Sequence, residues 1–589
     1  MRHLLPPAVV LAAILAAGSA RAQETTSSEE AQLLAILSEE TAIATKTRMN
    51  SDFVPGIVTV LHGDELEALG VETAWEALSL VPGMMAVRDN PGLPSVFVRG
   101  LDFPFNSGNV KVLVNSIPLS RESAGINGIA LFIPVQLIDR IEVIRGPGSV
   151  LYGDFAFMGL VNIVTRQEGQ RAYLREGGDK AFSGGVALNF QDPKEGWNAS
   201  VLASGFLNNT AAVNSPREAK EKRGFGAVSI QKGGFSFTAE GVSRRVDDQS
   251  VEPGQPLTGG QGHWAVEGRY GRDLTPSFHA EIRASFLHNR FDTQISDFKG
   301  DVISTGVDAK WTGWRDHALL FSVDYTGSRI SEAGFSYAVM PGQPPLTLAL
   351  FAQNRDAFGL TLQDTFDVSP KLAITAGARF DRYSDIGSRV TPRLAVVWRV
   401  TDEHIVKAQY AEGFRAPTFF EEYGSGRRDP DLDFEVNQTV EASYAFRRPD
   451  TAARATIFFS RIHDMIFPVM GLGRFDNGHK AQAWGVELEA ERQIGERVKV
   501  TAQYSWVDSE DNRNFPRVTQ TPPSRAPSLA GASVLVRALS RTLVGARWSL
   551  VGRRNVPNGD GFNLVDLTVT QNELFVPGLQ LRAGVKNVL

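Results

Sequence analysis

Glycines spaced along one short stretch form the pattern in this chain that first suggests chemistry. Gly146, Gly148, Gly153 and Gly159 lie within segment 141–166, and glycine lets a backbone wrap closely around a phosphate. A phosphate loop also needs Gly-Lys-Ser/Thr, or the third glycine of a dinucleotide fingerprint, and this segment has neither. The glycines therefore predict tight turns and close packing rather than nucleotide binding.

Other residue types that carry catalysis or metal binding also form no pattern. The chain has no cysteine, which excludes disulfides, thiolate metal sites and a cysteine nucleophile. Its nine histidines are scattered without metal-ligand spacing. Neither Gly-x-Ser-x-Gly nor His-Glu-x-x-His occurs, and a formal charge of -6 is not that of a nucleic-acid binder. We therefore expect no enzyme, no resident cofactor and no nucleic-acid partner.

Two strand-like runs, 141–144 and 160–164, position the glycine-rich stretch. The whole segment, IEVIRGPGSVLYGDFAFMGLVNIVTR, resembles the end of the plug domain of TonB-dependent outer-membrane receptors. The pattern of that family runs close to IEV(I/V)RGPxSxLYGxxAxxGxxNIxT. The match is long, and it implies a bacterial outer-membrane receptor in which a plug fills a β-barrel.

The N-terminus has the form of a secretory signal peptide covering residues 1–22. Arg2 and His3 precede an apolar core from Val9 to Ala17, and Ala20-Arg21-Ala22 fits a small-x-small cleavage site. A membrane anchor is the alternative, but the apolar run is too short to cross a bilayer. We expect an exported protein.

Residues 23–45 are predicted to form a periplasmic tail that ends in a TonB box. The segment Glu40, Thr41, Ala42, Ile43, Ala44, Thr45 resembles that short extended element, which pairs with an edge strand of TonB by β-augmentation. An ordinary leading strand is the alternative reading.

Residues 46–170 are predicted to form the plug, an α/β domain. Val54–Val60 reads as a strand, and His62–Leu69 and Thr73–Leu80 as amphipathic helices capped by Asp64 and Thr73. Val110–Val114 resembles the "vLvlvDGvPl" strand of the family, with Asn115-Ser116 at its turn in place of Asp-Gly. The alternative interpretation is a small α/β domain with a different function.

Residues 171–589 alternate apolar and polar side chains with a period of two, as in segments 372–380, 498–506 and 579–585. The runs have roughly the 9–11 residues that a tilted strand needs to cross a membrane. Short links such as 231–234 and 367–370 alternate with long polar ones such as 246–260 and 463–477. This is the pattern of an antiparallel transmembrane β-barrel.

The barrel predicted here has about 21 strands, whereas bacterial single-chain barrels close with an even number. Lys586-Asn-Val-Leu589 resembles the element that precedes one last strand in the family. We therefore expect the closing strand to be missing from this sequence; with it the count would be about 22, the number of plugged transporters. Further resemblances lie at Tyr410–Pro417 and Trp484–Glu489.

In the family, arginines of the plug motifs pair with glutamates of the barrel wall. The resemblance places Arg99 and Arg145 in that role, and their candidate partners are Glu441 and Glu487, which the alternation puts on the lumen side. Solvated lumen charges are the alternative. If such a pair is held away from water, removal of one partner is expected to cost a few kcal/mol.

The ligand is expected where plug apices meet the long loops. Aromatic and arginine side chains there suit an anionic, partly aromatic metal chelate, although each also suits a structural loop. The candidates are Arg88, Asn90, Phe103, Phe105, Asn106 and Arg121.

These readings lead to active import of a scarce ligand, a ferric siderophore, cobalamin or a similar chelate carrying iron or cobalt. The chain resembles most the subgroup of the colicin I and cobalamin receptors. The expected partners are TonB with its inner-membrane energising complex and outer-membrane lipid, and the protein is expected to be a monomer. A passive substrate-specific channel is the alternative, and an outer-membrane enzyme is disfavoured by the absence of catalytic motifs.

Overall fold

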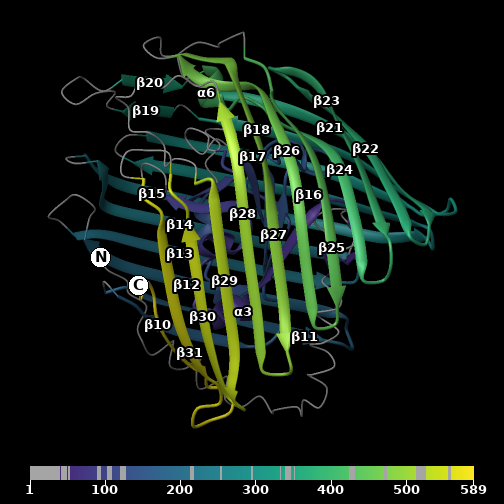
Figure 1. The fold of residues 1–589 in the computed structure, drawn as a ribbon. Coiled ribbons are helices and arrows are strands. Elements are labelled where there is room, and N and C mark those ends of the chain that lie inside the picture. The colour runs from purple at the N-terminus through teal and green to yellow at the C-terminus, as the bar shows by residue number, and fades with distance from the viewer. Residues whose placement is uncertain are drawn as a thin grey trace.

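The structure, a computed structural model, shows a small α/β domain enclosed by one long antiparallel sheet (Figure 1). Among the residues that it describes, no helix is long and apolar enough to cross a membrane. The described residues are 40–41, 49–50, 54–88, 94–101, 109–119, 128–178, 180–211, 218–252, 255–293, 296–331, 333–337, 346–350, 352–423, 432–469, 474–511, 526–554 and 559–588.

The enclosed domain, called the plug below, is built on a five-stranded sheet in the order β3-β8-β9-β6-β7. Strands β6 and β9 are parallel and the other neighbours antiparallel. Strands β4 and β5 form a separate antiparallel pair. The elements are β3 (Ile57–His62), α3 (Gly63–Ala68), α4 (Ala74–Ala77), η1 (Leu78–Leu80), β4 (Met84–Arg88), β5 (Pro94–Val98), β6 (Val110–Val114), β7 (Ile117–Pro118), η3 (Gly128–Phe132), η4 (Val135–Leu137), β8 (Ile138–Arg145), α5 (Ser149–Tyr152) and β9 (Gly159–Thr165).

The two predicted plug helices are present, with one correction. Thr73 caps α4 as expected, since its hydroxyl accepts from the backbone N–H of Glu76. The predicted Asp64 cap is wrong: α3 begins at Gly63 with His62 as its N-cap and no side-chain cap bond. Asp64 lies in the first turn and binds Arg166 instead.

The first plug strand begins later than predicted. Pro55 has no N–H to donate, and Gly56 has a φ of 99°, so the regular ladder starts at Ile57. The predicted turn at Asn115-Ser116 is confirmed, with φ angles of 50° and 67° that suit a tight hairpin between β6 and β7.

The enclosing sheet runs without interruption from β10 to β32 and contains 23 strands in the described part of the chain. Its strands are β10 (Arg171–Glu176), β11 (Phe182–Asp192), β12 (Trp197–Ala211), β13 (Glu218–Lys232), β14 (Phe235–Glu252), β15 (Gln255–Thr275), β16 (Phe278–Thr293), β17 (Ser296–Trp311), β18 (His317–Ile330), β19 (Ala333–Tyr337), β20 (Leu346–Leu350), β21 (Gln353–Ser369), β22 (Leu372–Tyr383), β23 (Gly387–Arg399), β24 (His404–Arg415), β25 (Glu435–Arg448), β26 (Thr451–Val469), β27 (Arg474–Ile494), β28 (Val498–Asp511), β29 (Ser528–Leu539), β30 (Thr542–Val551), β31 (Phe562–Gln571) and β32 (Leu581–Val585).

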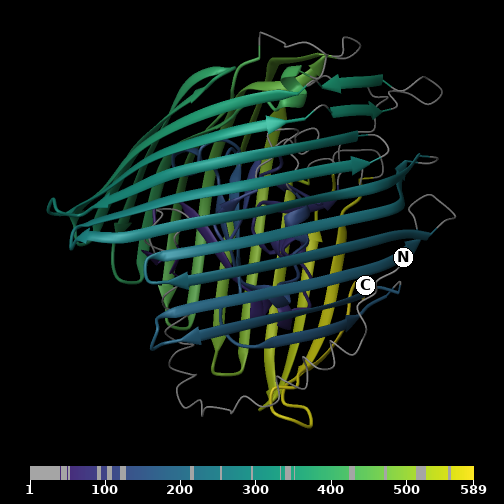
Figure 2. The same cartoon turned by 180° about the vertical axis from the view of Figure 1, so that it is seen from behind.

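Twenty-one of these strands make the wall, because β19 and β20 are a hairpin inserted between β18 and β21, which pair directly. Figures 1 and 2 show the wall on opposite sides of the purple plug. The rim at which β10 begins carries the short turns, and the other rim carries the long loops. Among the described residues, no recorded pairing joins β10 to β32, so the predicted closing strand stays a prediction.

Several wall strands are longer than the sequence suggested. The predicted loop 246–260 is mostly strand, since β14 continues to Glu252 and β15 starts at Gln255. Likewise β26 and β27 reach to Val469 and Arg474 within the predicted loop 463–477. The polar residues in these segments therefore do not mark the end of strand pairing.

The plug and the wall share one apolar core. Leu78, Leu131 and Phe157 of the plug belong to the same buried cluster as Ala265 and Phe458 of the wall. The plug also has a smaller apolar cluster of its own, which includes Val58 and Leu160. The larger, shared cluster makes the seated plug part of the barrel interior.

The Asn115 turn provides a test of plug stability. Its side-chain carbonyl accepts from the backbone N–H and hydroxyl of Thr165, at 2.9 and 3.0 Å. Asn115→Ala should lower the free energy of plug unfolding by about 2 kcal/mol, because both donors lose their acceptor and alanine disfavours the positive φ. Urea unfolding of the plug within the intact barrel measures this. Glu168→Ala, an exposed site nearby, should change it by less than about 0.5 kcal/mol; an equal loss in both variants would contradict the assignment.

Candidate functional site

Two wall strands, β25 and β27, both paired to β26, bring glutamates into the lumen. The strand alternation turns Val440 and Tyr444 outward and Glu441 inward. On β27 the same alternation turns Glu487 and Glu489 inward. Glu441 and Glu487 are only 2% and 1% exposed, so a cation must meet them there.

Arg99 of the plug supplies one such cation. It follows β5 with a φ of 52°, and its backbone N–H donates to the carbonyl of Gly83 at 2.7 Å. The guanidinium donates to both carboxylate oxygens of Glu487, at 3.0 and 3.3 Å, and also to Glu441. The Cζ atom of the guanidinium lies over the Phe458 ring, 4.0 Å from the ring centre. A sparsely populated backbone conformation thus delivers a fully buried arginine to two wall carboxylates.

Arg145, at the end of β8, supplies the second cation. Its two terminal nitrogens donate to Glu487 and Glu489, each at 2.8 Å, and one of them also donates to the Thr59 hydroxyl of β3 at 3.1 Å. Arg454 of the wall strand β26 binds the same Glu489 and Thr59. The network therefore joins three plug elements to three wall strands.

All four residues of the predicted plug–wall contact thus lie together in the structure. Burial on its own would lower the pKa of the Arg99 guanidinium, but Glu441 and Glu487 raise it above its ordinary value. The arginine therefore stays charged while buried, which is the condition for a strong bidentate pair.

The sequence did not lead to Glu489 or Arg454 as members of this contact. Glu489 had a signal, because it stands two residues beyond Glu487 on the same face of an alternating strand. Arg454 had none beyond its own alternation on β26, since its partner Thr59 lies 395 positions away in the sequence.

Two plug glycines make room for the wall carboxylates. A Cβ at Gly83 would lie 2.6 Å from Oε1 of Glu487, and a Cβ at Gly146 would lie 2.9 Å from Oε1 of Glu441. Both also have positive φ, at 72° and 95°. A larger residue at either position would strain the backbone and would require the carboxylate or the plug backbone to shift.

A second contact, of opposite polarity, lies around α3 and α4. Here the plug is acidic and most of its partners are bases of the wall, in contrast to the arginine network. We call it the acidic collar; its pairs are Asp64 with Arg166 and Arg171, Glu65 with Lys499, Glu67 with Arg171 and Arg582, Glu72 with Arg175 and Lys586, and Glu76 with Arg547 and Lys586.

The pKa of Glu72 reports the strength of this collar. Burial alone would raise it, but Arg175 and Lys586 lower the pKa of Glu72 from 4.5 to about 2. The pKa of Asp64 is lowered as well: burial opposes the shift, and Arg166 and Arg171 overcome it. Asp64 and Glu72 are therefore ionised throughout the physiological range.

At the long-loop rim, a short helix α6 (Phe419–Tyr423) is held by buried arginines. Arg415 donates to both oxygens of Glu421, at 2.7 and 3.0 Å, and to Glu435 at 2.5 Å. This fixes the predicted Tyr410–Pro417 motif to the helix that follows it. A second clamp is made by Arg355, whose partners are Asp385, Glu422 and the carbonyl of Pro417.

The predicted ligand residues are for the most part not described. Arg88 ends β4, where its backbone pairs with Pro94. Asn90, Phe103, Phe105, Asn106 and Arg121 lie outside the described residues. Within the ranges that are described, no group of three or more acidic, histidine or cysteine residues is placed to hold a metal ion.

The predicted TonB box is described only at its start. Glu40 and Thr41 form the short strand β1 (Glu40–Thr41), which pairs antiparallel with β2 (Met49–Asn50). Ala42, Ile43, Ala44 and Thr45 lie outside the described residues. The backbone that is described is extended, the conformation that strand addition requires.

A wall of antiparallel strands, with a plug held inside it by buried ion pairs, defines a plugged outer-membrane receptor. The family model described as "TonB dependent receptor-like, beta-barrel" matches residues 165–588, and the model "TonB-dependent Receptor Plug Domain" matches residues 51–160. The chain therefore belongs to the TonB-dependent receptor family, which places it in the outer membrane as an importer and not an enzyme.

Curated relatives are distant. The vitamin B12 transporter BtuB of Vibrio vulnificus is 25% identical over 446 residues, 69% of this chain and 68% of the relative. An iron-regulated outer membrane virulence protein of Vibrio cholerae is 22% identical over 512 residues, 77% and 76% of the two chains. Among solved structures, the ferric yersiniabactin uptake receptor FyuA of Yersinia pestis superposes with a TM-score of 0.72 at 17% identity, covering 91% and 92%. This last likeness supports the fold alone.

Loss of one lumen carboxylate should loosen the plug. Glu487→Gln keeps the side-chain shape but leaves Arg99 and Arg145 with one carboxylate each, so the free energy of plug unfolding should fall by about 3–5 kcal/mol. Urea unfolding measures the change. Glu491→Gln on the same strand removes a half-exposed pair with Lys499 and should cost less than about 1 kcal/mol. Equal effects would show that burial of the network contributes nothing.

The acidic collar predicts a pH dependence. Because the pKa of Glu72 is about 2 in the folded protein and 4.5 ordinarily, its stabilisation is complete above pH 4.5 and lost as the pH falls toward 2. The urea midpoint of the plug should decline over that interval. In Glu72→Gln the decline should be shallower; identical pH profiles would contradict the role of this pair.

Proposed function

We propose that this receptor imports a metal chelate, either a ferric siderophore or cobalamin, and that TonB engages it through Glu40 to Thr45. The observation that carries the proposal is the buried network of Arg99, Arg145, Glu441 and Glu487. Thermal motion alone does not displace a plug that is held by such contacts. Passage of a ligand through the barrel therefore needs work supplied from outside the receptor. We assign these four residues as the plug–wall lock.

The ligand class is supported by the relatives and by the chemistry of the plug apices. One relative is named a vitamin B12 transporter and another is named as iron-regulated. On this basis we place the chain in the subgroup of colicin I and cobalamin receptors. Arginine and aromatic side chains suit an anionic chelate, and the proposed contacts are Arg88, Asn90, Phe103, Phe105, Asn106 and Arg121.

The α6 clamps support a rigid outer mouth. Arg355 and Arg415 are 1% and 0% exposed, and each binds at least two carboxylates. The segment that they fix therefore presents its remaining side chains in one arrangement, and a preorganised surface binds a scarce ligand at lower entropic cost.

The short β1–β2 ladder supports a releasable tail. Its register contains only two residue pairs, Glu40 with Asn50 and Thr41 with Met49. A two-stranded ladder of this size is marginal in water, so exchange of its partner strand for a strand of TonB meets little resistance. We place the tail in the periplasm at residues 23–45, the plug at 46–170 and the barrel at 171–589.

Deletion of residues 40–45 should abolish uptake while leaving ligand binding intact. The test compares accumulation of radiolabelled ferric siderophores and radiolabelled cobalamin by iron-limited cells carrying either the deletion or the full chain. Deletion of residues 28–33, an equal length of upstream tail, is the matched control and should leave uptake unchanged.

The substrate that accumulates only in cells with the full chain names the ligand. Uptake that survives loss of residues 40–45 would overturn the importer proposal in favour of the alternative, a passive substrate-specific channel.

A further inference from the structure

The plug residues that follow the tail are held to the wall through their backbone. Arg393 of β23 donates to the carbonyl of Pro55 at 2.6 Å. Lys407 of β24 donates to the carbonyls of Val54 and Gly56, at 3.0 and 3.3 Å. Both cations are buried, at 9% and 6% exposure. Two neighbouring wall strands thus grip three consecutive carbonyls.

The grip continues into β3. Arg454 donates to the carbonyl of Val58 at 2.9 Å and to the hydroxyl of Thr59 at 3.2 Å. Three wall cations therefore hold a stretch of six residues, 54–59. Unlike the lock, most of these bonds join a cation to a neutral carbonyl, which makes each weaker than a bidentate arginine–carboxylate pair.

Strand β3 lies where a pull on the tail arrives first. It is an edge strand of the plug sheet, and its recorded pairing in the described residues is with β8 alone. The lock arginines, by contrast, lie after β5 and at the end of β8, deeper in the plug sequence. Force applied at the tail therefore reaches residues 54–59 before it reaches Arg99. Arg145 contacts this stretch directly, because it pairs with Ile57 in the ladder and donates to the hydroxyl of Thr59.

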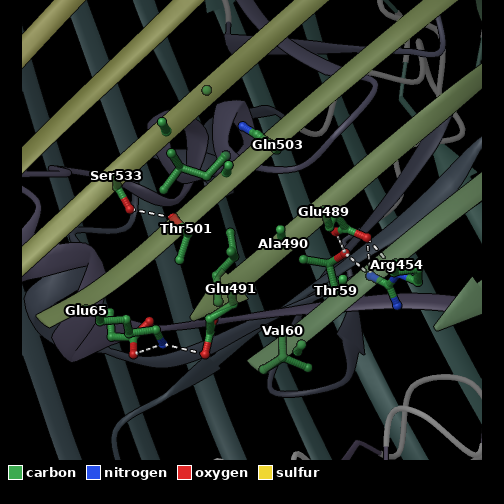
Figure 3. Close-up of a pocket in the computed structure, with 18 of the residues that line it drawn as sticks. Thr59, Val60, Glu65, Arg454, Glu489, Ala490, Glu491, Thr501, Gln503 and Ser533 are labelled. Atoms are coloured by element: carbon green, nitrogen blue, oxygen red, sulfur yellow. Dashed lines mark hydrogen bonds and ion pairs between the residues drawn. The ribbon is translucent and has the colours of Figure 1, made fainter. Parts of the chain in front are cut away.

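A cavity separates part of β3 from the wall. It has a volume of about 190 Å³ and lies between β3 and α3 on one side and the wall on the other (Figure 3). Its wall side is lined by small residues together with larger ones such as Phe446 and Leu535. Figure 3 shows charged groups at two ends of it. Arg454 pairs with Glu489 at one end, and at the other Glu65 and Glu491 both pair with Lys499. The small residues are Ala453, Ala490, Ala502, Gly531 and Ala532.

We propose that Arg393, Lys407 and Arg454 form a carbonyl clasp, a set of positioning residues that sets how hard the tail must be pulled before β3 leaves the wall. When the clasp opens, β3 separates from β8 and from the wall, while the pairs of Arg99 with Glu441 and Glu487 still hold the rest of the plug. This inference rests on the proposed function, because it takes the tail as the point at which TonB pulls.

Gly56 allows the clasp to be tested from the plug side. A Cβ at this position would lie 3.1 Å from Nη2 of Arg393 and 3.3 Å from Oε1 of Gln409, and its φ is 99°. Gly56→Ala should therefore disturb the clasp without altering any wall cation.

The experiment pulls directly on the tail of the full-length receptor in a lipid bilayer. Because the chain has no cysteine, Thr45→Cys gives one attachment point for a force handle. The readout is the lifetime of the first extension step at constant force. Arg393→Gln and Lys407→Gln should each shorten it about tenfold, and Gly56→Ala should shorten it too. Lys407→Arg, which keeps a cation, should restore it at least in part.

The matched control is Arg547→Gln, which removes a buried wall cation that binds the plug at Glu76, away from residues 54–59. It should leave the first step unchanged. No TonB is present, so the result does not depend on whether residues 40–45 are the box, and the uptake test decides that separately. An unchanged first step in the Arg393→Gln/Lys407→Gln double variant, with the barrel folded, would overturn the clasp. So would an equal shortening by Arg547→Gln.

Discussion

The structure depends on a balance of buried charge at the plane where plug and wall meet. Arg99, Arg145 and Arg454 face Glu441, Glu487 and Glu489, three cations against three carboxylates. Neither set is tolerable alone, because an unpaired ion away from water is strongly destabilising. The wall glutamates therefore need the plug as much as the plug needs the wall. The shared apolar core has the same consequence, since each domain completes the interior of the other.

The charges of the plug are also distributed unevenly between its two contacts with the wall. Its arginines meet wall acids within the lumen, and its α3–α4 carboxylates meet wall bases nearer the rim where β10 begins. An inverted plug would set like charges against each other in both places, and such contacts are repulsive. Electrostatics thus favours one orientation of the plug, and the ion pairs and the apolar core together hold it in place. The two networks also differ in burial: the first is mostly buried and is screened less by salt, and the second is partly exposed and is screened more.

Much of this arrangement could be predicted from the sequence. Period-two alternation located the wall, and it oriented Glu441 and Glu487 correctly because the face of a strand follows from position alone. Arg99 and Arg145 came from a resemblance, not from geometry. Arg393, Lys407 and Arg454 could not be foreseen, since their acceptors are backbone carbonyls that carry no side-chain signal and lie more than three hundred residues away. The prediction that Asp64 caps α3 was wrong because the helix begins one residue earlier, at Gly63, and the Asp64 carboxylate binds Arg166 instead. The predicted ends of several wall strands were wrong because backbone pairing continues beyond the last apolar residues of the alternating pattern.

The glycines at positions 83 and 146 have a consequence for how such receptors can be recombined. At each position a carboxylate of the wall lies where a side chain would be, and the positive φ of the plug backbone favours glycine there as well. The plug surface therefore contains a mould of the wall at two positions where its own backbone also favours glycine. A plug transplanted into a foreign barrel would carry that mould with it. It should fit only barrels whose lumen offers glutamates at matching heights, and shorter aspartates would leave voids beside both arginines.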